Sequence, residues 1–238
     1  GKKPLTITGV TAASKPYDGT TNADISSVTF DGVNLNRGTD YTVTANFDDA
    51  GVDNDKHITA TVTLRGQTAK NYALEQSSFT TTGSITKAAA PTVQPVELTV
   101  INGLAKTYLV NLPALPTLGD NCKYGSIKYE ACNFDLIGEG GYANSTAMIT
   151  SNDEFQLTVP AVESQAEGSV GTVGVKITTD NYQDMLLTVE VIAKNKIVPV
   201  LDGEITATPI TYGDTLSDSS ITGKMKDPNT GDEVNGTF

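Results

Sequence analysis

The chain has 238 residues, and its 28 acidic side chains outnumber its 16 basic ones, which leaves a formal net charge of −12. A negative excess of this size repels nucleic-acid phosphates, so no nucleic-acid partner is expected. No apolar run approaches the roughly 20 residues that span a bilayer, so no membrane insertion is expected within this sequence. At about 100–150 residues per domain, the length allows two domains and part of a third.

Threonine is the residue that most exceeds its usual share, with 35 positions out of 238. Thr is β-branched and favours strands over helices. No stretch combines an apolar period of about 3.6 residues with helix start and stop signals. The composition therefore predicts an all-β protein whose solvated sheet faces are rich in threonine.

The first part of the chain, residues 1–88, reads as short strands separated by turns. Residues 57–64 place Ile, Ala, Val and Leu on one side and Thr on the other, with a period of two. Residues 42–47 and 79–85 are further strands of this kind. Such alternation is typical of an antiparallel sheet with one buried and one wet face. We expect a β-sandwich over residues 1–88.

Three further segments follow in chain order. Residues 89–95 contain two prolines among small residues, which indicates a short, semi-rigid connector of extended character. Residues 96–196 again alternate in several places and predict a second β-sandwich of the Ig-like kind. Residues 197–238 are too few for a complete sandwich, so a third, truncated module is expected there. We expect this last piece either to dock on the second sandwich or to pair an exposed edge with another molecule.

Short self-similar segments recur along the chain. KPYDGTT at residues 15–21 is similar to TYGDT at residues 211–215. An Asn-Tyr pair precedes a terminal strand twice, at Tyr72 and at Tyr182. Repetition of this kind is typical of tandem modules.

These motifs resemble a known family. The KPYDGTT motif, the NYAL element and the closing SITKA resemble the YDG-type repeat of large bacterial, most familiarly Gram-positive, cell-surface proteins, over roughly residues 4–88. The stretch EGSVGTVGVKITTDNYQ is similar to bacterial Ig-like modules, and TYGDTLSDSSITG is similar to the start of an MBG-type repeat. The resemblance implies tandem Ig-like β-sandwiches in an extracellular, cell-wall-associated or secreted array, and it brings no catalytic residues.

The YDG motif also has a physical interpretation. Asp18 can hydrogen-bond its own backbone and Gly19 can adopt a positive φ, so together they form a turn. Tyr17 can bury its ring while its hydroxyl keeps a polar partner. A structural role is the main interpretation, and a ligand role for Tyr17 and Asp18 is the alternative. The residues assigned a structural role by these motifs are Tyr17, Asp18, Gly19, Tyr72, Tyr182, Tyr212 and Gly213.

Acidic residues gather in the segment FDDAGVDND. Calcium binds carboxylate and carbonyl oxygens, so this segment is a candidate calcium site. The spacing does not match an EF-hand, however, and Asp and Asn are also ordinary turn residues. Both interpretations stand for Asp48, Asp49, Asp53 and Asp55.

The chain has two cysteines, Cys122 and Cys132. In an oxidising compartment they could form a disulfide that closes a short loop, and in a reducing one they would stay free thiols. Two thiols alone lack the four ligands of a structural zinc site.

Nothing in the sequence points to catalysis. His57 is the only histidine, it stands at the start of a strand, and no nucleophile elbow or phosphate-binding loop accompanies it. We expect no enzyme activity and no cofactor.

A group of aromatic residues in the second segment suggests the main functional alternative. Exposed rings can form a platform for sugars, although tyrosines on a strand more often face a core. The candidate glycan contacts are Tyr124, Tyr129 and Tyr142.

Taken together, these features predict a non-catalytic repeat region of a bacterial surface protein or adhesin. It would act as a stalk or spacer, with weak adhesive contacts to host or environmental glycans or proteins and with neighbouring modules of the same chain as partners. The alternative is a carbohydrate-binding accessory module of a secreted glycan-active enzyme.

Overall fold

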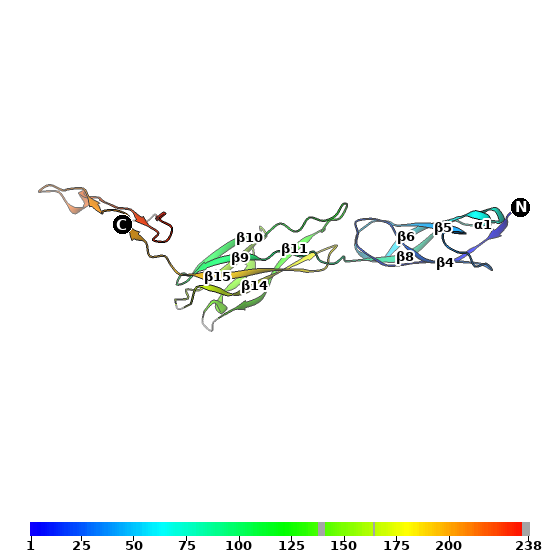
Figure 1. Cartoon of the computed structure of the whole chain (residues 1–238), viewed down its shortest axis with the longest axis horizontal. Coiled ribbons are helices and arrows are strands. Elements are labelled where there is room, and N and C mark those ends of the chain that lie inside the picture. Colours follow the sequence, from blue (N-terminus) through cyan, green and yellow to red (C-terminus); the bar gives the residue numbers. More distant parts are fainter. Residues whose placement is uncertain (138–140, 164, 235–238) are drawn as a thin grey trace.

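The computed structural model describes residues 1–137, 141–163 and 165–234. The molecule is elongated, and its three parts follow one another along the long axis, with the N-terminus at one extremity (Figure 1). Strands account for almost all of the regular structure described. The predicted all-β class is confirmed, and the two larger parts are Ig-like β-sandwiches.

The first unit comprises residues 3–86. Its main sheet has the strand order β3-β8-β6-β5, and smaller sheets pair β2 with β4 and β1 with β7. The elements are β1 (Lys3–Leu5), β2 (Ile7–Ala12), β3 (Lys15–Pro16), β4 (Ile25–Phe30), β5 (Tyr41–Phe47), β6 (Asp53–Leu64), α1 (Gly66–Asn71), β7 (Tyr72–Leu74) and β8 (Ser78–Thr86).

Strand β6 shows why this unit folds as a sandwich. Ile58, Ala60 and Val62 are buried, and the threonines between them are exposed, as the alternation predicts. On β5, Phe47 pairs with Ile58 and Ala45 pairs with Ala60, so both strands turn the same apolar rows inward. Burial of each of the larger side chains, Phe47, Ile58 and Val62, contributes roughly 1.5–3 kcal/mol in favour of the fold.

The second unit comprises residues 96–194. A four-stranded sheet, β11-β14-β15-β9, faces a three-stranded sheet, β10-β13-β12. The elements are β9 (Val96–Ile101), β10 (Lys106–Asn111), β11 (Ile127–Leu136), η1 (Tyr142–Asn144), β12 (Thr146–Ile149), β13 (Glu154–Val159), β14 (Gly168–Thr179) and β15 (Met185–Lys194).

The core of the second unit lies between these two sheets. Strand β15 alternates strictly, with Leu187, Val189 and Val191 fully buried, and β13 contributes Phe155 and Leu157 from the opposite sheet. The period-two pattern of these strands therefore builds a continuous interior, as expected for a sandwich with one face in and one face out.

The predicted connector, residues 89–95, makes contacts along the second unit. Ala88 forms a parallel β-bridge with Tyr182, and Val96 at the start of β9 pairs with Val189 of β15. Val93, between these points, packs against the core of the second unit. The segment therefore runs along the second unit, and the chain leaves the first unit at Lys87.

The third segment, residues 197–234, is built differently. Its strands are all two residues long: β16 (Val200–Leu201), β17 (Thr206–Ala207), β18 (Ile221–Thr222), β19 (Met225–Lys226) and β20 (Glu233–Val234), with the short helix η2 (Leu216–Asp218). Among its described residues no apolar side chain is buried. The last four residues of the predicted third module lie outside the described part.

Candidate functional site: the junction between the two sandwiches

Three tyrosines from distant parts of the sequence meet where the first unit ends and the second begins. Tyr17 follows β3 of the first unit, whereas Tyr124 and Tyr182 stand in loops of the second. The ring centroids of Tyr17 and Tyr182 are 5.7 Å apart at an interplanar angle of 77°, and those of Tyr124 and Tyr182 are 5.3 Å apart at 54°. The Tyr17–Tyr182 pair is edge-to-face, a contact that contributes about 0.5–1.5 kcal/mol beyond the area that it buries, and the Tyr124–Tyr182 pair is tilted.

The junction continues the interior of the first unit. Tyr17 and Tyr182 are each only 8% exposed and belong to one apolar cluster with Ile25, Phe47 and Ile85 of the first unit. From the second unit, the partly buried side chains that pack against this cluster are Leu118, Cys122 and Tyr124. Residues of both units therefore share one dry interior at their boundary.

Hydrogen bonds across the boundary accompany this packing. The backbone N–H of Lys123 donates to the hydroxyl of Tyr17 at 3.0 Å, and Nζ of Lys87 donates to the carbonyl of Thr179 at 2.6 Å. The N–H of Ala88 donates to the carbonyl of Asn181, and the N–H of Gln183 donates to the carbonyl of Ala88, both at 2.9 Å. Backbone groups at a buried boundary must be satisfied, so these bonds specify the fit between the units.

The loop that carries Tyr182 is fixed from within the second unit. The hydroxyl of Thr179 accepts the N–H of Tyr182 and donates to its carbonyl, both at 3.1 Å. The side-chain amide of Asn181 donates to the carbonyl of Lys123 at 2.9 Å, which ties this loop to the loop that carries Tyr124. The repeated Asn-Tyr pair thus has a clear role here: Asn181 holds two loops together and Tyr182 fills the junction.

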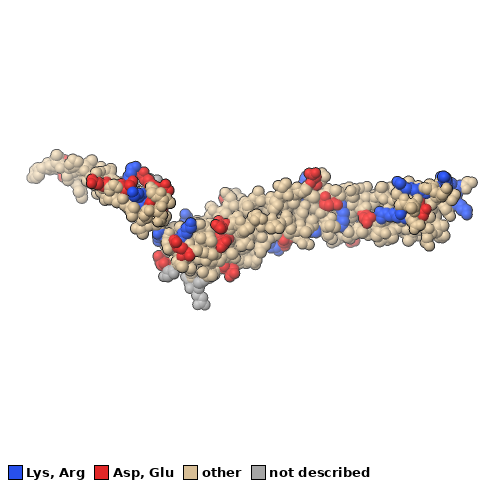
Figure 2. All heavy atoms as spheres, in the orientation of Figure 1, with Lys and Arg blue, Asp and Glu red and all other residues tan. Residues whose placement is uncertain are grey.

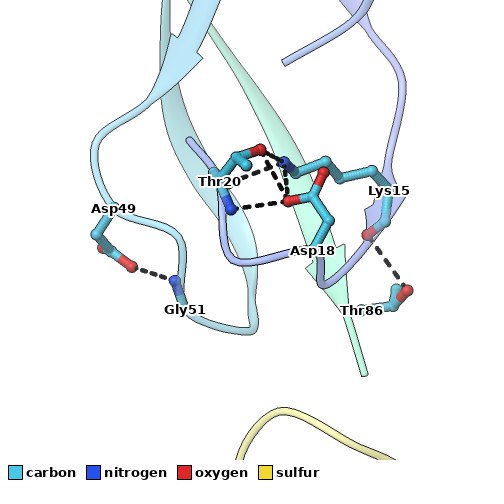
Figure 3. A network of polar contacts seen from close by, with 6 residues as sticks. All are labelled: Lys15, Asp18, Thr20, Asp49, Gly51 and Thr86. Atoms are coloured by element: carbon cyan, nitrogen blue, oxygen red, sulfur yellow. Dashed lines mark hydrogen bonds and ion pairs between the residues drawn. The ribbon is translucent and has the colours of Figure 1, made fainter. Parts of the chain in front are cut away.

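The YDG turn (Tyr17, Asp18 and Gly19) is held from within the first unit (Figure 3). The carboxylate of Asp18 accepts the N–H and the hydroxyl of Thr20 and pairs with Nζ of Lys15 at 2.8 Å. Partial burial works to raise the pKa of Asp18, but the hydrogen bonds from Lys15 and Thr20 outweigh it and keep the pKa below its ordinary value. The turn therefore stays ordered with its charge neutralised.

Gly19 lies directly against the second unit. Its φ is +73°, a conformation that favours glycine. A Cβ at this position would stand 2.6 Å from the carbonyl oxygen of Asn121 and 3.0 Å from the backbone nitrogen of Cys122. The position therefore requires glycine for two reasons: its backbone has a positive φ, and the backbone of Asn121 and Cys122 leaves no room for a Cβ.

Tyr182 has the most strongly shifted hydroxyl at the junction. Burial raises its pKa to about 12, and a hydrogen bond with Cys122 together with the neighbouring Tyr17 and Tyr124 acts in the same direction. A tyrosinate here would be a charge in the apolar interior, which is why the neutral form is favoured.

The remaining residues to which the motifs assign a structural role are spread along the chain. Tyr72 is half-buried at the start of β7 and packs on the second apolar cluster of the first unit, far in sequence from the YDG turn. Tyr212 in the third segment is fully exposed, and Gly213 beside it has a φ of +106° with nothing near its missing Cβ. The turn conformation of the third segment matches the expectation, but its tyrosine packs on nothing.

Of the two alternatives for the cysteines, the structure shows free thiols and no disulfide between them. Cys122 and Cys132 are both free and partly buried. Cys122 packs in the junction beside Tyr182, whereas Cys132 lies on β11, where Asn133 forms a bulge and the Sγ stands over Gly174. Their separation along the sequence is short, but the fold assigns them to different surroundings.

The predicted calcium site does not form among the residues described, because no three acidic, histidine or cysteine side chains converge as metal ligands there. Asp49 instead accepts the N–H of Gly51 and pairs with Nζ of Lys56 at 2.7 Å, and these contacts, the Lys56 hydrogen bond first, lower its pKa. The carboxylate of Asp53 accepts the N–H of Asn54, and Asp55 has a φ of +52°. These aspartates therefore shape the turn and bulge between β5 and β6, with Asp48 exposed beside them.

The three tyrosines suggested as glycan contacts do not form a surface platform. Tyr142 is completely buried, so for this residue the prediction is wrong. Tyr124 lies in the junction and donates its hydroxyl to the carbonyl of Pro116 at 2.8 Å. Tyr129 on β11 is half-buried against the core of the second unit. Burial raises the pKa of all three hydroxyls, as expected for tyrosines that serve packing.

A buried polar network in the second unit was not anticipated from the sequence. Asn102 is only 5% exposed, and its side-chain amide donates to the carbonyl of Gln165 and to Oδ1 of Asn195. Its Oδ1 accepts the hydroxyl of Tyr142 at 2.8 Å. A single Asn before Gly103 reads as a turn residue, and only the fold reveals that it connects three separate loops.

The first unit of the chain matches a known protein family. Residues 1–83 match the family model of the YDG domain. This part of the chain is similar to a YDG domain. The match covers the strands of the first unit up to β8 and therefore includes the turn that contacts the second unit. The search of curated proteins gave no match for the chain.

Solved structures resemble the chain only distantly. An I-band fragment of titin has 10% identity and a TM-score of 0.36, with 81% of this chain and 64% of the fragment covered. Drosophila N-cadherin has 12% identity and a TM-score of 0.29, with 84% and 53% covered. The Bacteroides ovatus mixed-linkage glucan utilization locus SGBP-B, in complex with a mixed-linkage heptasaccharide, has 13% identity and a TM-score of 0.23, with 80% and 48% covered. The chain spans less than two thirds of each of these proteins. Their TM-scores are too low to support an inference about the function of this chain.

Among the helices described, none has both the length and the apolar character needed to cross a membrane.

Proposed function

We propose that this chain is a non-catalytic spacer, part of the extracellular repeat region of a bacterial surface protein. In this role it holds another part of the protein at a distance from the cell, and its own surfaces make only weak adhesive contacts with host or environmental glycans or proteins. The single observation that carries the proposal is the packed junction that joins two sandwiches end to end.

The argument is mechanical. A flexible chain spans a distance that grows only as the square root of its length, whereas rigid units in line add their full lengths. Two sandwiches that share an apolar boundary, a hydrogen bond across it between Lys123 and Tyr17, and hydrogen bonds from the connecting residues Lys87 and Ala88 to the second unit add in this second way. The end-to-end order of the parts in Figure 1 is the geometry that a spacer requires.

The surface supports a role without a chemical site. Acidic side chains are spread over the face of the molecule drawn in Figure 2, and Asp18, Asp180 and Asp184 near the junction form hydrogen bonds or ion pairs with neighbouring groups. His57 is exposed on β6, in register with Thr82 of β8. The match of residues 1–83 to the YDG domain supports the assignment to a repeat region.

The test measures how far the chain holds a reporter from the cell surface. The chain is placed between a cell-surface anchor and a fluorescent reporter, and the height of the reporter is compared with that given by a Gly/Ser linker of equal length. We expect the native chain to hold the reporter markedly farther from the surface. Equal heights would contradict the proposal. A glycan-array screen of the same protein distinguishes the alternative, because saturable glycan binding that Tyr129→Ala abolishes would favour a carbohydrate-binding accessory module.

A further inference from the structure

The YDG turn touches the second unit in a way that its role as a turn does not require. The first unit contains a second Asp-Gly turn, Asp31 and Gly32, in which Gly32 has a φ of +67° and nothing lies within 4 Å of its missing Cβ. Gly19 has nearly the same φ, yet its missing Cβ would collide with the backbone of Asn121. The two turns share their local chemistry and differ in what lies against them.

We propose that the YDG turn is a docking element for the unit that follows it, and that residues 118–124 together with Tyr182 form its receptor. The pair fixes the angle between neighbouring sandwiches. It also selects which kind of unit can follow a YDG domain: an Ig-like unit that presents a backbone N–H, a close-packed carbonyl and a tyrosine ring at this end. This inference rests on the proposed spacer function and names the partner surface of that function.

The shape of the receptor supports this role. Asn121 adopts a left-handed conformation, with a φ of +63°, and the N–H of Cys122 donates to the carbonyl of Gly119 at 3.1 Å. Asn tolerates this conformation better than most residues. The resulting tight turn brings the carbonyl of Asn121 against Gly19, where only a residue without Cβ leaves room.

The polar contact at the centre of the interface adds specificity. The hydroxyl of Tyr17 accepts the N–H of Lys123, and the ring of Tyr17 meets Tyr182 edge-on. A buried polar group without a partner costs more than the hydrogen bond itself is worth, and a following unit without a matching donor would leave the hydroxyl of Tyr17 unpaired and would dock poorly.

The carboxylate of the YDG turn is paired within the first unit. Lys15 pairs with Asp18 inside the first unit, and no ion pair among the described residues connects the two units. An unpaired carboxylate at the turn would face a second unit that contains many acidic residues. The internal pair lets the turn approach without repulsion, and the interface then depends little on salt.

The experiment uses the whole chain and a matched pair of variants. Residual dipolar couplings of the backbone amides give one alignment tensor for the first unit and one for the second. In the native chain the two tensors should coincide, because the units tumble as one body. Gly19→Ala should abolish this agreement, since the new Cβ meets Asn121. Gly32→Ala carries the same strain from a positive φ but contacts nothing, so the two tensors should still coincide.

A second variant covers the case in which Gly19→Ala does not fold. Tyr17→Phe keeps the ring and removes the acceptor of the Lys123 N–H, and it should loosen the agreement between the tensors while leaving each unit's couplings internally consistent. Coincident tensors in both Gly19→Ala and Tyr17→Phe would overturn the proposal, as would an equal loss in Gly32→Ala. Separate tensors in the native chain would overturn the docking inference alone, because reach in the reporter assay can survive a loose joint.

Discussion

Two junctions connect the three parts of the chain, and they differ in the interactions that form them. Between the first and second units, tyrosine rings and backbone hydrogen bonds form a continuous interior. Between the second unit and residues 197–234, Asn195, Lys196, Asp227 and Thr230 line an open hollow of about 560 Å³. No hydrogen bond connects the described residues on its two sides.

This difference shows what defines a joint in a tandem β protein. A short connector alone does not fix the arrangement of two neighbouring parts, because the connection is short in sequence at both junctions. The first junction is specified because apolar surface leaves water there and because backbone hydrogen bonds of Ala88 and Lys123 accompany the packing. The third segment has neither feature: none of its described apolar side chains is buried, and its described strands are only two residues long.

The largest effect should come from the core of the second unit. Phe155 is fully buried between the sheets, and Phe155→Ala should lower the free energy of unfolding by about 3–5 kcal/mol through lost burial and a residual cavity. Leu216→Ala, at a side chain that is 82% exposed in the third segment, should change it by less than about 0.5 kcal/mol. Urea unfolding followed by circular dichroism measures both. Similar losses would mean that the third segment has a core of its own.

A smaller loss is expected at the end of the second unit that faces the third segment. Asn102→Ala leaves the hydroxyl of Tyr142 and the carbonyl of Gln165 without their partner, which should cost about 1–3 kcal/mol. The control is Asn111→Ala, at an exposed position on β10. Hydrogen exchange of the amides around Gln165 and Asn195 should accelerate only in the first variant. If it does not, the network does not hold these loops.

The junction itself should respond more mildly. Tyr17→Phe removes one hydrogen bond between the units and should lower the free energy of unfolding by about 0.5–1.5 kcal/mol. Tyr41→Phe is the matched control, because Tyr41 is also buried in the first unit but its hydroxyl has no hydrogen-bond partner among the described residues. Thermal unfolding compares the two variants. An equal decrease in both would place the effect in the ring packing and not in the contact with Lys123.

The smallest effect is a change with pH. The pKa of Tyr182 is raised from 10.0 to about 12, so the folded protein holds this proton more tightly than the unfolded chain does. The stabilisation from the neutral hydroxyl is therefore complete below pH 10 and is lost as the pH rises through about 12. Spectrophotometric titration of tyrosinate should show a late-ionising group that Tyr182→Phe removes. A titration unchanged by this variant would place the late ionisation at another tyrosine.

Part of this architecture follows from local patterns. The alternation in residues 57–64 predicts β6 and its buried face, and Asp18-Gly19 predicts a turn, because both depend on neighbours two or three residues away. The Asn-Tyr pair at Asn181-Tyr182 stands in a loop that leads into β15, whereas the pair at Asn71-Tyr72 stands where α1 ends and β7 begins. The same local reasoning leaves the state of the cysteines open and fails at Tyr142, because the surroundings of these residues come from strands far away in the sequence.

The amino-acid sequence by itself determined the all-β class, the sandwich strands and the turn at Gly19, since period-two burial and a positive φ are properties of short segments. Only the tertiary structure decided that Tyr17 meets Tyr182, that Gly19 lies against Asn121 and that Asn102 connects three loops. These contacts join residues that are 40 to 165 positions apart in the chain, as between Asn102 and Tyr142 or between Tyr17 and Tyr182. No local pattern encodes such a meeting, because it exists only once two separate sheets have folded and exclude water from the boundary between them.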